Sequence, residues 1–241
     1  MINETVTDVN LGIKLIQNSA GLNYGTDAYL LAAYLPVMKN AEAVEIGGGS
    51  GIISLLAAQR EKFSHITCVE VQDYYAELCK RNIELNGMEK KIASLCCDIR
   101  DCTIRNVPVV FGNPPFMKNN AGKRNEDDGK NSARHELHGD ISELCRAASA
   151  ILKYGGYFFC VYRPDRLTDL TDGMRKSGIE PKKMTFVHAD VAHAPCLVLV
   201  TGKKGGKSGV EITRPLILTD RETGRPTEDS DFIYSECEWI K

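Results

Sequence analysis

The run "VVFGNPPF" places an amide side chain and an aromatic ring directly after a short hydrophobic segment. Residues 109–111 predict a short buried strand. Pro114 and Pro115 carry no backbone N–H and fix their own φ, and Pro114 biases Asn113 toward an extended conformation. The sequence therefore predicts a stiff turn that presents the Asn113 amide and the Phe116 ring where the strand ends. Taken alone, the motif is equally compatible with a strand-terminating loop and a core phenylalanine.

A second group of residues has types and spacing suited to binding a nucleotide. In "VEIGGGSGIISLLAAQR", Glu45, Gly47, Gly49 and Gly51 lie where a predicted strand meets a helix. Glycines let a ligand approach the backbone closely, and the helix N-terminus offers free N–H groups. A dinucleotide site requires G-x-G-x-x-G, but Ile52 stands where the third glycine is needed. A nicotinamide dinucleotide is therefore a poor fit.

Carboxylates follow the next two predicted strands. Glu70 ends one strand, where it can accept both hydroxyls of a ribose, and Asp98 follows the other, where it can accept an adenine amino group. With Glu45, these acids lie at the carboxyl ends of successive strands, the edge where open α/β sheets bind ligands. A single strand-end acid is usually only solvated, and a glycine turn is often only a tight turn. Three such acids at successive strands favour a binding site.

These groups depend on a regular alternation of strands and helices. Helices are predicted over 27–35, 52–60, 73–86, 140–154 and 165–177, with Asp73 and Asp140 as possible caps and Gly155-Gly156 as a stop. Strands are predicted over 43–46, 65–71, 92–99, 107–112 and 157–163, followed by 182–189 and 196–202. The alternation predicts an α/β fold with a mostly parallel sheet covered on both faces. The last two strands are close enough in sequence to pair as an antiparallel hairpin at its edge.

The chain divides into three parts by composition. Residues 1–24 predict a small β-hairpin, and residues 25–201 hold the alternating elements of the main domain. Residues 202–241 begin with a flexible basic stretch, "GKKGGKSG", and continue as a tail with a strand and a turn. We expect this tail to pack on the main domain.

The motifs "EIGGGSG", "CVEV", "CCDI" and "NPPF", in this order, resemble those of class I S-adenosylmethionine-dependent methyltransferases. The resemblance covers roughly residues 25–200 and implies a Rossmann-like, seven-stranded sheet with a reversed last hairpin. It also implies that S-adenosylmethionine is the cofactor. The implied cofactor-binding residues are Glu45, Gly47, Gly49, Gly51, Glu70, Val71, Asp98, Ile99 and Asn113.

The same resemblance gives the stiff turn a catalytic role, with Asn113, Pro114, Pro115 and Phe116 as the catalytic residues. The lone pair of an exocyclic amine is delocalised into the base and must be turned toward the sulfonium methyl. The Asn113 side-chain carbonyl and the Pro114 backbone carbonyl can each accept one N–H, while Phe116 stacks on the base. Positioned acceptors then carry most of the catalysis, without a covalent intermediate.

Further segments resemble the bacterial tRNA (adenine-N6)-methyltransferases that act on valine tRNA. They are "LNYGTDAYLLAAYLP", "SARHE", "KYGGYFFCVYRPDRL" and "RPLILTD". This resemblance implies that Gly25, Thr26 and Asp27 flank the methyl donor, although Thr26 or Asp27 can also cap a helix. Those enzymes commonly have tyrosine at the position of Phe116, and phenylalanine also occurs in ribosomal-RNA guanine-N2 enzymes.

Several functions therefore remain open. The leading interpretation is an N-methyltransferase that acts on adenine N6 in tRNA. Guanine N2 in ribosomal RNA and a glutamine side chain in a protein pose the same lone-pair problem. A non-catalytic RNA- or nucleotide-binding module that kept the fold is an alternative of a different class, and a dehydrogenase is the least favoured.

Composition limits the partners and the location. The net charge is −2, so an RNA site must be a local basic patch rather than a property of the whole surface. Candidate RNA contacts are Lys118, Lys123, Arg124, Arg134 and Arg163, and Lys203, Lys204 and Lys207 form a possible second patch. A solvated loop and a plain linker are the respective alternatives.

The nine cysteines contain no C-x-x-C pair and have no zinc spacing with the five histidines, so no metal is expected. No apolar run approaches the roughly 20 residues that span a bilayer, and no signal peptide is recognised. We expect reduced thiols, a cytoplasmic location, no membrane association and a monomer.

Overall fold

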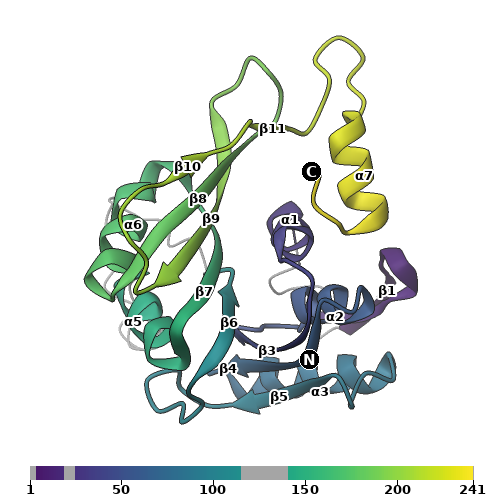
Figure 1. The fold of residues 1–241 in the computed structure, drawn as a ribbon. Coiled ribbons are helices and arrows are strands. Elements are labelled where there is room, and N and C mark those ends of the chain that lie inside the picture. The colour runs from purple at the N-terminus through teal and green to yellow at the C-terminus, as the bar shows by residue number, and fades with distance from the viewer. Residues whose placement is uncertain (1–3, 19–24, 115–140, 241) are drawn as a thin grey trace, which may run out of the picture.

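A nine-stranded sheet in the order β10-β8-β9-β7-β6-β3-β4-β5, with β11 also paired to β8, runs through the centre of the protein (Figure 1). The computed structural model describes residues 4–18, 25–114 and 141–240. The strands of this sheet are β3 (Met38–Ile46), β4 (Phe63–Glu70), β5 (Ile92–Cys96), β6 (Val107–Gly112), β7 (Leu152–Tyr162), β8 (Ile179–His188), β9 (Pro195–Lys204), β10 (Glu211–Ile212) and β11 (Leu216–Ile217).

The pairing of the strands confirms the predicted fold class. Strands β5, β4, β3, β6 and β7 pair in parallel, and β9 runs antiparallel to both of its neighbours, β7 and β8. Seven long strands with one reversed strand are the predicted arrangement. The sheet extends further than expected because β10 and β11 pair in parallel with the outer edge of β8. These short strands satisfy backbone groups that an edge strand otherwise leaves exposed.

Helices cover both faces of the sheet. On one face lie α1 (Thr26–Tyr34), α2 (Ile52–Gln59), α3 (Asp73–Leu85) and α7 (Glu228–Glu236), and on the other α5 (Ile141–Ile151) and α6 (Leu167–Lys176). Strand β6 shows the alternation that divides the two cores: Val109 and Phe111 pack with the first group, and Val110 packs with the second. A side chain at position 113 continues the first face, which is the face of α1.

An antiparallel hairpin lies outside the sheet, and the buried side-chain amide of Asn82 connects it to the rest of the domain. The hairpin consists of β1 (Glu4–Asp8) and β2 (Lys14–Asn18), with the short helix η1 (Asn10–Gly12) between them. The Asn82 side chain, on α3, accepts from the Ile16 N–H (2.7 Å) and donates to the carbonyls of Ile16 (3.1 Å) and Ser50 (3.0 Å). One side chain therefore connects the hairpin, α3 and the glycine turn.

Three local expectations are wrong. The pair Gly155-Gly156 does not end a helix: α5 ends at Ile151, and both glycines lie inside β7, beside a register irregularity that the positive φ of Gly155 (78°) accommodates. Residues 202–204 continue β9 instead of starting a flexible stretch, and the Lys204 ammonium donates to the carbonyls of Ser149 and Leu152. Asp73 is not the cap of α3: it is the first residue of the helix, and Gln72 is the N-cap.

Candidate active site

Sheet register brings the two turns of the predicted site to one edge. Ile46, the last residue of β3, is opposite Val69 of β4 on one side and Gly112 of β6 on the other. The glycine turn that starts at Gly47 and the turn that starts at Asn113 therefore leave adjacent strands at the same level. Both lie at the carboxyl edge of the parallel strands, where α/β sheets bind ligands.

The glycine turn requires glycine at several positions. Gly47, Gly49 and Gly51 have φ of 71°, 54° and 83°, values that side-chain-bearing residues rarely adopt. A Cβ added to Gly51 would lie 2.7 Å from the Cys79 Sγ, whereas the space beside Gly47 and Gly49 is open. The turn is thus packed against α3 on one side and leaves room for a ligand on the other.

Glu70 is held rigidly at the end of β4. Its Oε2 accepts the Gly49 N–H and its Oε1 accepts the Gln72 N–H, both at 3.0 Å, and the residue is 6% exposed. A carboxylate offers about four lone-pair sites, so two remain for the hydroxyls of a ribose. This geometry suits the role predicted for Glu70.

Glu45 faces the core beneath the turn. Its carboxyl accepts from the Ser54 hydroxyl of α2 and from the Cys68 thiol of β4. Burial raises the pKa of Glu45 to about 7, although the hydrogen bonds from Ser54 and Cys68 oppose that shift. These contacts join β3, β4 and α2, so we assign Glu45 to supporting the turn. Sequence reasoning missed Ser54 and Cys68, because their motif positions read as ordinary core residues.

Asp98 and the residues beside the strand ends form the next part of the edge. The Arg100 side chain donates to both carboxylate oxygens of Asp98 and its backbone N–H to Oδ1 (2.9 Å), so these hydrogen bonds lower the pKa of Asp98. Val71 is 42% exposed, and Ile99 packs at the margin of the core. Val71 therefore offers an apolar surface next to Glu70, and Asp98 is fixed as an ionised acceptor.

Asn113 is held by the start of α1. Its Nδ2 donates to the Asp27 Oδ2 at 2.8 Å, and the Asp27 Oδ1 accepts the Ala28 N–H at 3.0 Å. The other end of the amide, the Asn113 Oδ1, is buried and has no hydrogen-bond partner among the described residues. Gly25 is the N-cap of α1, and Thr26 is the first residue of the helix. Asp27 is therefore in contact with the catalytic candidate.

Part of the predicted site lies outside the described residues. Pro114 follows Asn113 in the structure, but Pro115, Phe116, Lys118, Lys123, Arg124 and Arg134 are not among the residues described. Arg163 lies after β7 and pairs with Asp165, with 2.9 Å between Nε and Oδ1. This pair compensates much of the charge that Arg163 was expected to offer to RNA.

A buried lysine that the sequence did not predict supports α1. The Lys62 Nζ donates to the carbonyls of Ala32, Ala33 and Leu35, each at 2.8 Å, and the residue is 1% exposed. These carbonyls end the helix whose first turn carries Asp27. Burial lowers the pKa of Lys62 to about 8.

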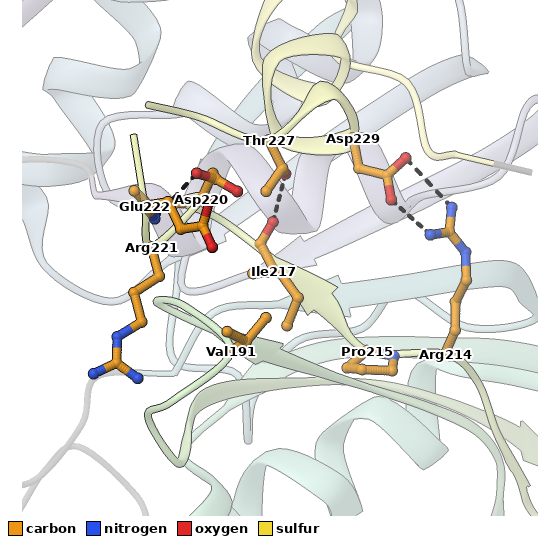
Figure 2. A pocket seen from close by; sticks show the side chains of 10 residues that line it. Val191, Arg214, Pro215, Ile217, Asp220, Arg221, Glu222, Thr227 and Asp229 are labelled. Carbon is orange, nitrogen blue, oxygen red and sulfur yellow. Dashed lines mark hydrogen bonds and ion pairs between the residues drawn. The ribbon is translucent and has the colours of Figure 1, made fainter. Parts of the chain in front are cut away.

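A cavity of about 420 Å³ lies elsewhere, between the C-terminal segment and the loop after β8 (Figure 2). Thr227 donates to the Ile217 carbonyl across it, and Arg214 pairs with Asp229. No predicted site residue lines it. The lining comprises Val191, Arg214, Pro215, Ile217, Thr219, Asp220, Arg221, Glu222, Thr227 and Asp229. Its three acids outnumber its two arginines, so it does not favour a phosphate.

Most of the cysteines lie in the core of the protein. All nine cysteines are free thiols, and six are buried, in agreement with their role as small core residues.

Within residues 4–18, 25–114 and 141–240, no group of three His, Cys, Asp or Glu side chains is arranged to hold a metal ion. Among the described helices, none has both the length and the apolar character needed to cross a membrane.

The sheet topology is that of the class I S-adenosylmethionine-dependent methyltransferases. The residues fit the cofactor: Glu70 keeps lone pairs for the ribose, and the glycine turn leaves open space beside Gly47 and Gly49. The chain belongs to the methyltransferase small domain family, whose model matches residues 19–169.

Named relatives are similar over most of the chain. A tRNA1(Val) (adenine(37)-N6)-methyltransferase of Bacteroides fragilis is 26% identical over 188 residues, which are 76% of this chain and 78% of the relative. An enzyme of the same name from Shewanella halifaxensis is 30% identical over 136 residues, covering 55% of this chain and 54% of the relative.

Solved structures share the fold. A predicted O-methyltransferase, Atu636 of Agrobacterium tumefaciens, has a TM-score of 0.72 at 20% identity and covers 89% of this chain and 98% of its own. The TYW2 protein of M. jannaschii, solved in complex with AdoMet, has a TM-score of 0.59 at 14% identity, with 84% and 86% covered. At these identities the likeness concerns the fold alone.

Proposed function

We propose that this methyltransferase transfers a methyl group to the exocyclic N6 amine of an adenosine in tRNA. The names of relatives at 26% and 30% identity support the choice of substrate. The observation that carries the chemistry is the Asn113 Oδ1, a buried acceptor without a described partner, at the level of the glycine turn. A buried polar group without a partner is costly, and an incoming N–H removes that cost.

The residues of the chain act by holding and orienting. S-adenosylmethionine supplies an electrophilic methyl group on its sulfonium. Asn113 accepts one N–H of the amine, and the Pro114 backbone carbonyl accepts the other, which turns the nitrogen lone pair out of conjugation with the ring. Glu70 and the glycine turn position the nucleoside part of the donor. Fixed acceptors and alignment of this kind accelerate a reaction without a covalent intermediate.

Contact with RNA is part of the same proposal. The basic side chains Lys118, Lys123, Arg124 and Arg134 belong to the segment that follows the catalytic turn in sequence. Arg163 follows β7, the strand beside β6, although Asp165 offsets its charge. Phosphate contacts of this type position a nucleic acid without reading its sequence. Salt should therefore weaken RNA binding much more than donor binding.

The test is to identify the methylated nucleoside. The protein is incubated with labelled S-adenosylmethionine and, separately, with tRNA and ribosomal RNA from cells that lack it, and the RNA is then digested. We expect label in N6-methyladenosine from tRNA. Label in N2-methylguanosine would mean that the target base is guanine instead of adenine, and that the amine chemistry is still correct. If neither RNA is labelled, the assay is repeated with protein extract from the same cells: label in a glutamine would replace the substrate class, and donor binding without any label would favour the non-catalytic module.

A further inference from the structure

The amide of Asn113 can present either of its two ends to a substrate, and its orientation decides what the site can recognise. If the Oδ1 faces the substrate, the site accepts a hydrogen bond, but if the Nδ2 faces it, the site donates one. An isolated asparagine can exchange these ends by rotating about its last side-chain torsion. The position of the Asn113 side chain alone therefore does not fix the chemistry.

Asp27 removes this ambiguity. An ionised carboxylate has no hydrogen to donate, so the end of the amide that faces it must be the NH2 group. The Asn113 Nδ2 lies 2.8 Å from the Asp27 Oδ2, within the range of a charge-assisted hydrogen bond. The Oδ1 must then point away from Asp27, and it is this atom that is buried without a described partner.

Asp27 is itself fixed in place. Its Oδ1 accepts the Ala28 N–H at 3.0 Å, in the first turn of α1, where the helix dipole favours a negative charge. Gly25 makes room for this carboxylate, because a Cβ on Gly25 would lie 2.8 Å from the Asp27 Oδ1. At the other end of the helix, the Lys62 ammonium binds the last carbonyls. Helix α1 thus carries Asp27 as a rigid support.

We propose that Asp27 is a positioning residue that locks the Asn113 amide with its oxygen toward the acceptor amine. With the amide held in this way, Asn113 can accept a hydrogen bond from the substrate but cannot donate one. The group to be methylated must therefore present an N–H, and a keto oxygen in the same place is rejected. This role rests on the proposed amine methylation, and it replaces the donor contact that the sequence resemblance implied for Asp27. Asp27 would then affect the rate of transfer and leave donor binding nearly unchanged.

The first experiment separates transfer from donor binding. Asp27→Ala should lower the single-turnover rate of methyl transfer to tRNA by about 10- to 100-fold, since the amide loses its fixed orientation. The Kd of S-adenosylhomocysteine, measured by calorimetry, should change by less than about threefold. The matched control is Asp169→Ala, which removes an acid from the first turn of α6 that pairs with Arg166. That control should change neither quantity.

An exchange of the two residues tests the hydrogen bond itself. Asn113→Asp alone places two carboxylates in contact and should lose most of the activity. Combined with Asp27→Asn, the pair can form the bond in the reverse direction, with one oxygen of the new carboxylate still facing the substrate. We expect the double variant to be at least about tenfold faster than Asn113→Asp. A double variant that is no faster, or a Kd that rises tenfold in Asp27→Ala, would overturn the proposal.

A measurement without RNA distinguishes failure of the lock from failure of the proposed substrate. The side-chain amide of Asn113 is observed by NMR in protein labelled with ¹⁵N-asparagine and is identified by its absence in Asn113→Ala. Its resonance should shift in Asp27→Ala and also in Gly25→Ala, which displaces the carboxylate without removing it. If the resonance shifts but no RNA is methylated, the lock stands and the substrate is wrong. If it does not shift in Asp27→Ala, the lock is wrong whatever the substrate.

Discussion

The glycine turn and the Asn113 turn leave adjacent strands at the same level, yet their polar groups are satisfied differently. Around the glycine turn, the carboxyl groups of Glu45 in β3 and Glu70 at the end of β4 have hydrogen-bond partners within the protein. In the other turn, one end of the Asn113 amide is bonded and the other has no described partner. Under the proposed function, the first region supports the donor, and the second keeps one acceptor open for the group that reacts.

This difference predicts that substitutions can impair methyl transfer and donor binding separately. The largest expected effect is on methyl transfer, at Asn113. Asn113→Ala removes an acceptor that acts on the reacting nitrogen, so methyl transfer should fall by about 100- to 1000-fold. Donor affinity should stay within about threefold of the wild type, measured by calorimetry with S-adenosylhomocysteine. An equal loss of donor affinity would mean that Asn113 serves the donor and that the two regions are not separate.

Glu70→Ala should give the opposite result. It removes the proposed ribose acceptor and also leaves the Gly49 and Gln72 N–H groups unbonded. A hydrogen bond to a charged group contributes about 1.5–3 kcal/mol, so the loss of a single ribose contact should already raise the donor Kd about 10- to 150-fold. The transfer rate at saturating donor should fall much less. Unchanged donor affinity would count against the ribose role of Glu70.

The placement of the glycine turn and the strand-end acids could be predicted from the sequence, but the contacts that orient Asn113 could not. The glycines and the acids at strand ends are local features, and parallel strands carry them to one edge once the α/β alternation is recognised. The bond between Asp27 and Asn113 joins residues 86 positions apart, and it depends on where α1 docks. No local pattern encodes that position.

Lys62 illustrates the same limit. In "QREKFSHI" it looks like a surface lysine, because lysine is rarely buried and its neighbours are charged. Its burial follows from three carbonyl partners at positions 32 to 35, which end a helix on another part of the chain. The helix end predicted at Gly155-Gly156 is wrong for a related reason. Pairing with β6 keeps β7 extended through a glycine pair that usually ends an element.

The packing of the glycine turn against α3 can be tested with two glycines of the same turn. Gly47→Ala and Gly51→Ala both place a side chain at positive φ, which costs about 1–2 kcal/mol. Only Gly51→Ala also meets the Cys79 Sγ, and overpacking adds about 1–3 kcal/mol. Urea unfolding should therefore show the larger loss of stability for Gly51→Ala.

Shortening Cys79 is the control for this contact. The added Cβ would lie 2.7 Å from the Cys79 Sγ but 3.7 Å from its Cβ, so Cys79→Ala removes the close atom. In the Cys79→Ala background, Gly51→Ala should cost about as much as Gly47→Ala costs in the wild type. If the extra cost of Gly51→Ala persists there, the contact with α3 is not its source.

The smallest expected effect is a pH dependence of stability that comes from Glu45. Its pKa rises from 4.5 to about 7 on folding, chiefly because of burial. Below pH 4.5 the carboxyl is protonated in both states, whereas between 4.5 and 7 only the folded protein keeps the proton. The free energy of unfolding should therefore fall as the pH rises through this window, by an amount on the order of 1–3 kcal/mol.

Glu45→Gln isolates this contribution, because the amide cannot ionise and can still accept from Ser54. Urea unfolding of the wild type and of Glu45→Gln is compared at about pH 5 and about pH 7.5, so that other titrating groups cancel. The variant should gain stability relative to the wild type as the pH rises. Parallel stabilities at the two values would mean that Glu45 ionises in the folded protein as readily as in the unfolded chain. The carboxyl beneath the glycine turn would then need access to solvent, and the contrast between a closed donor support and an open acceptor would be weaker than the structure indicates.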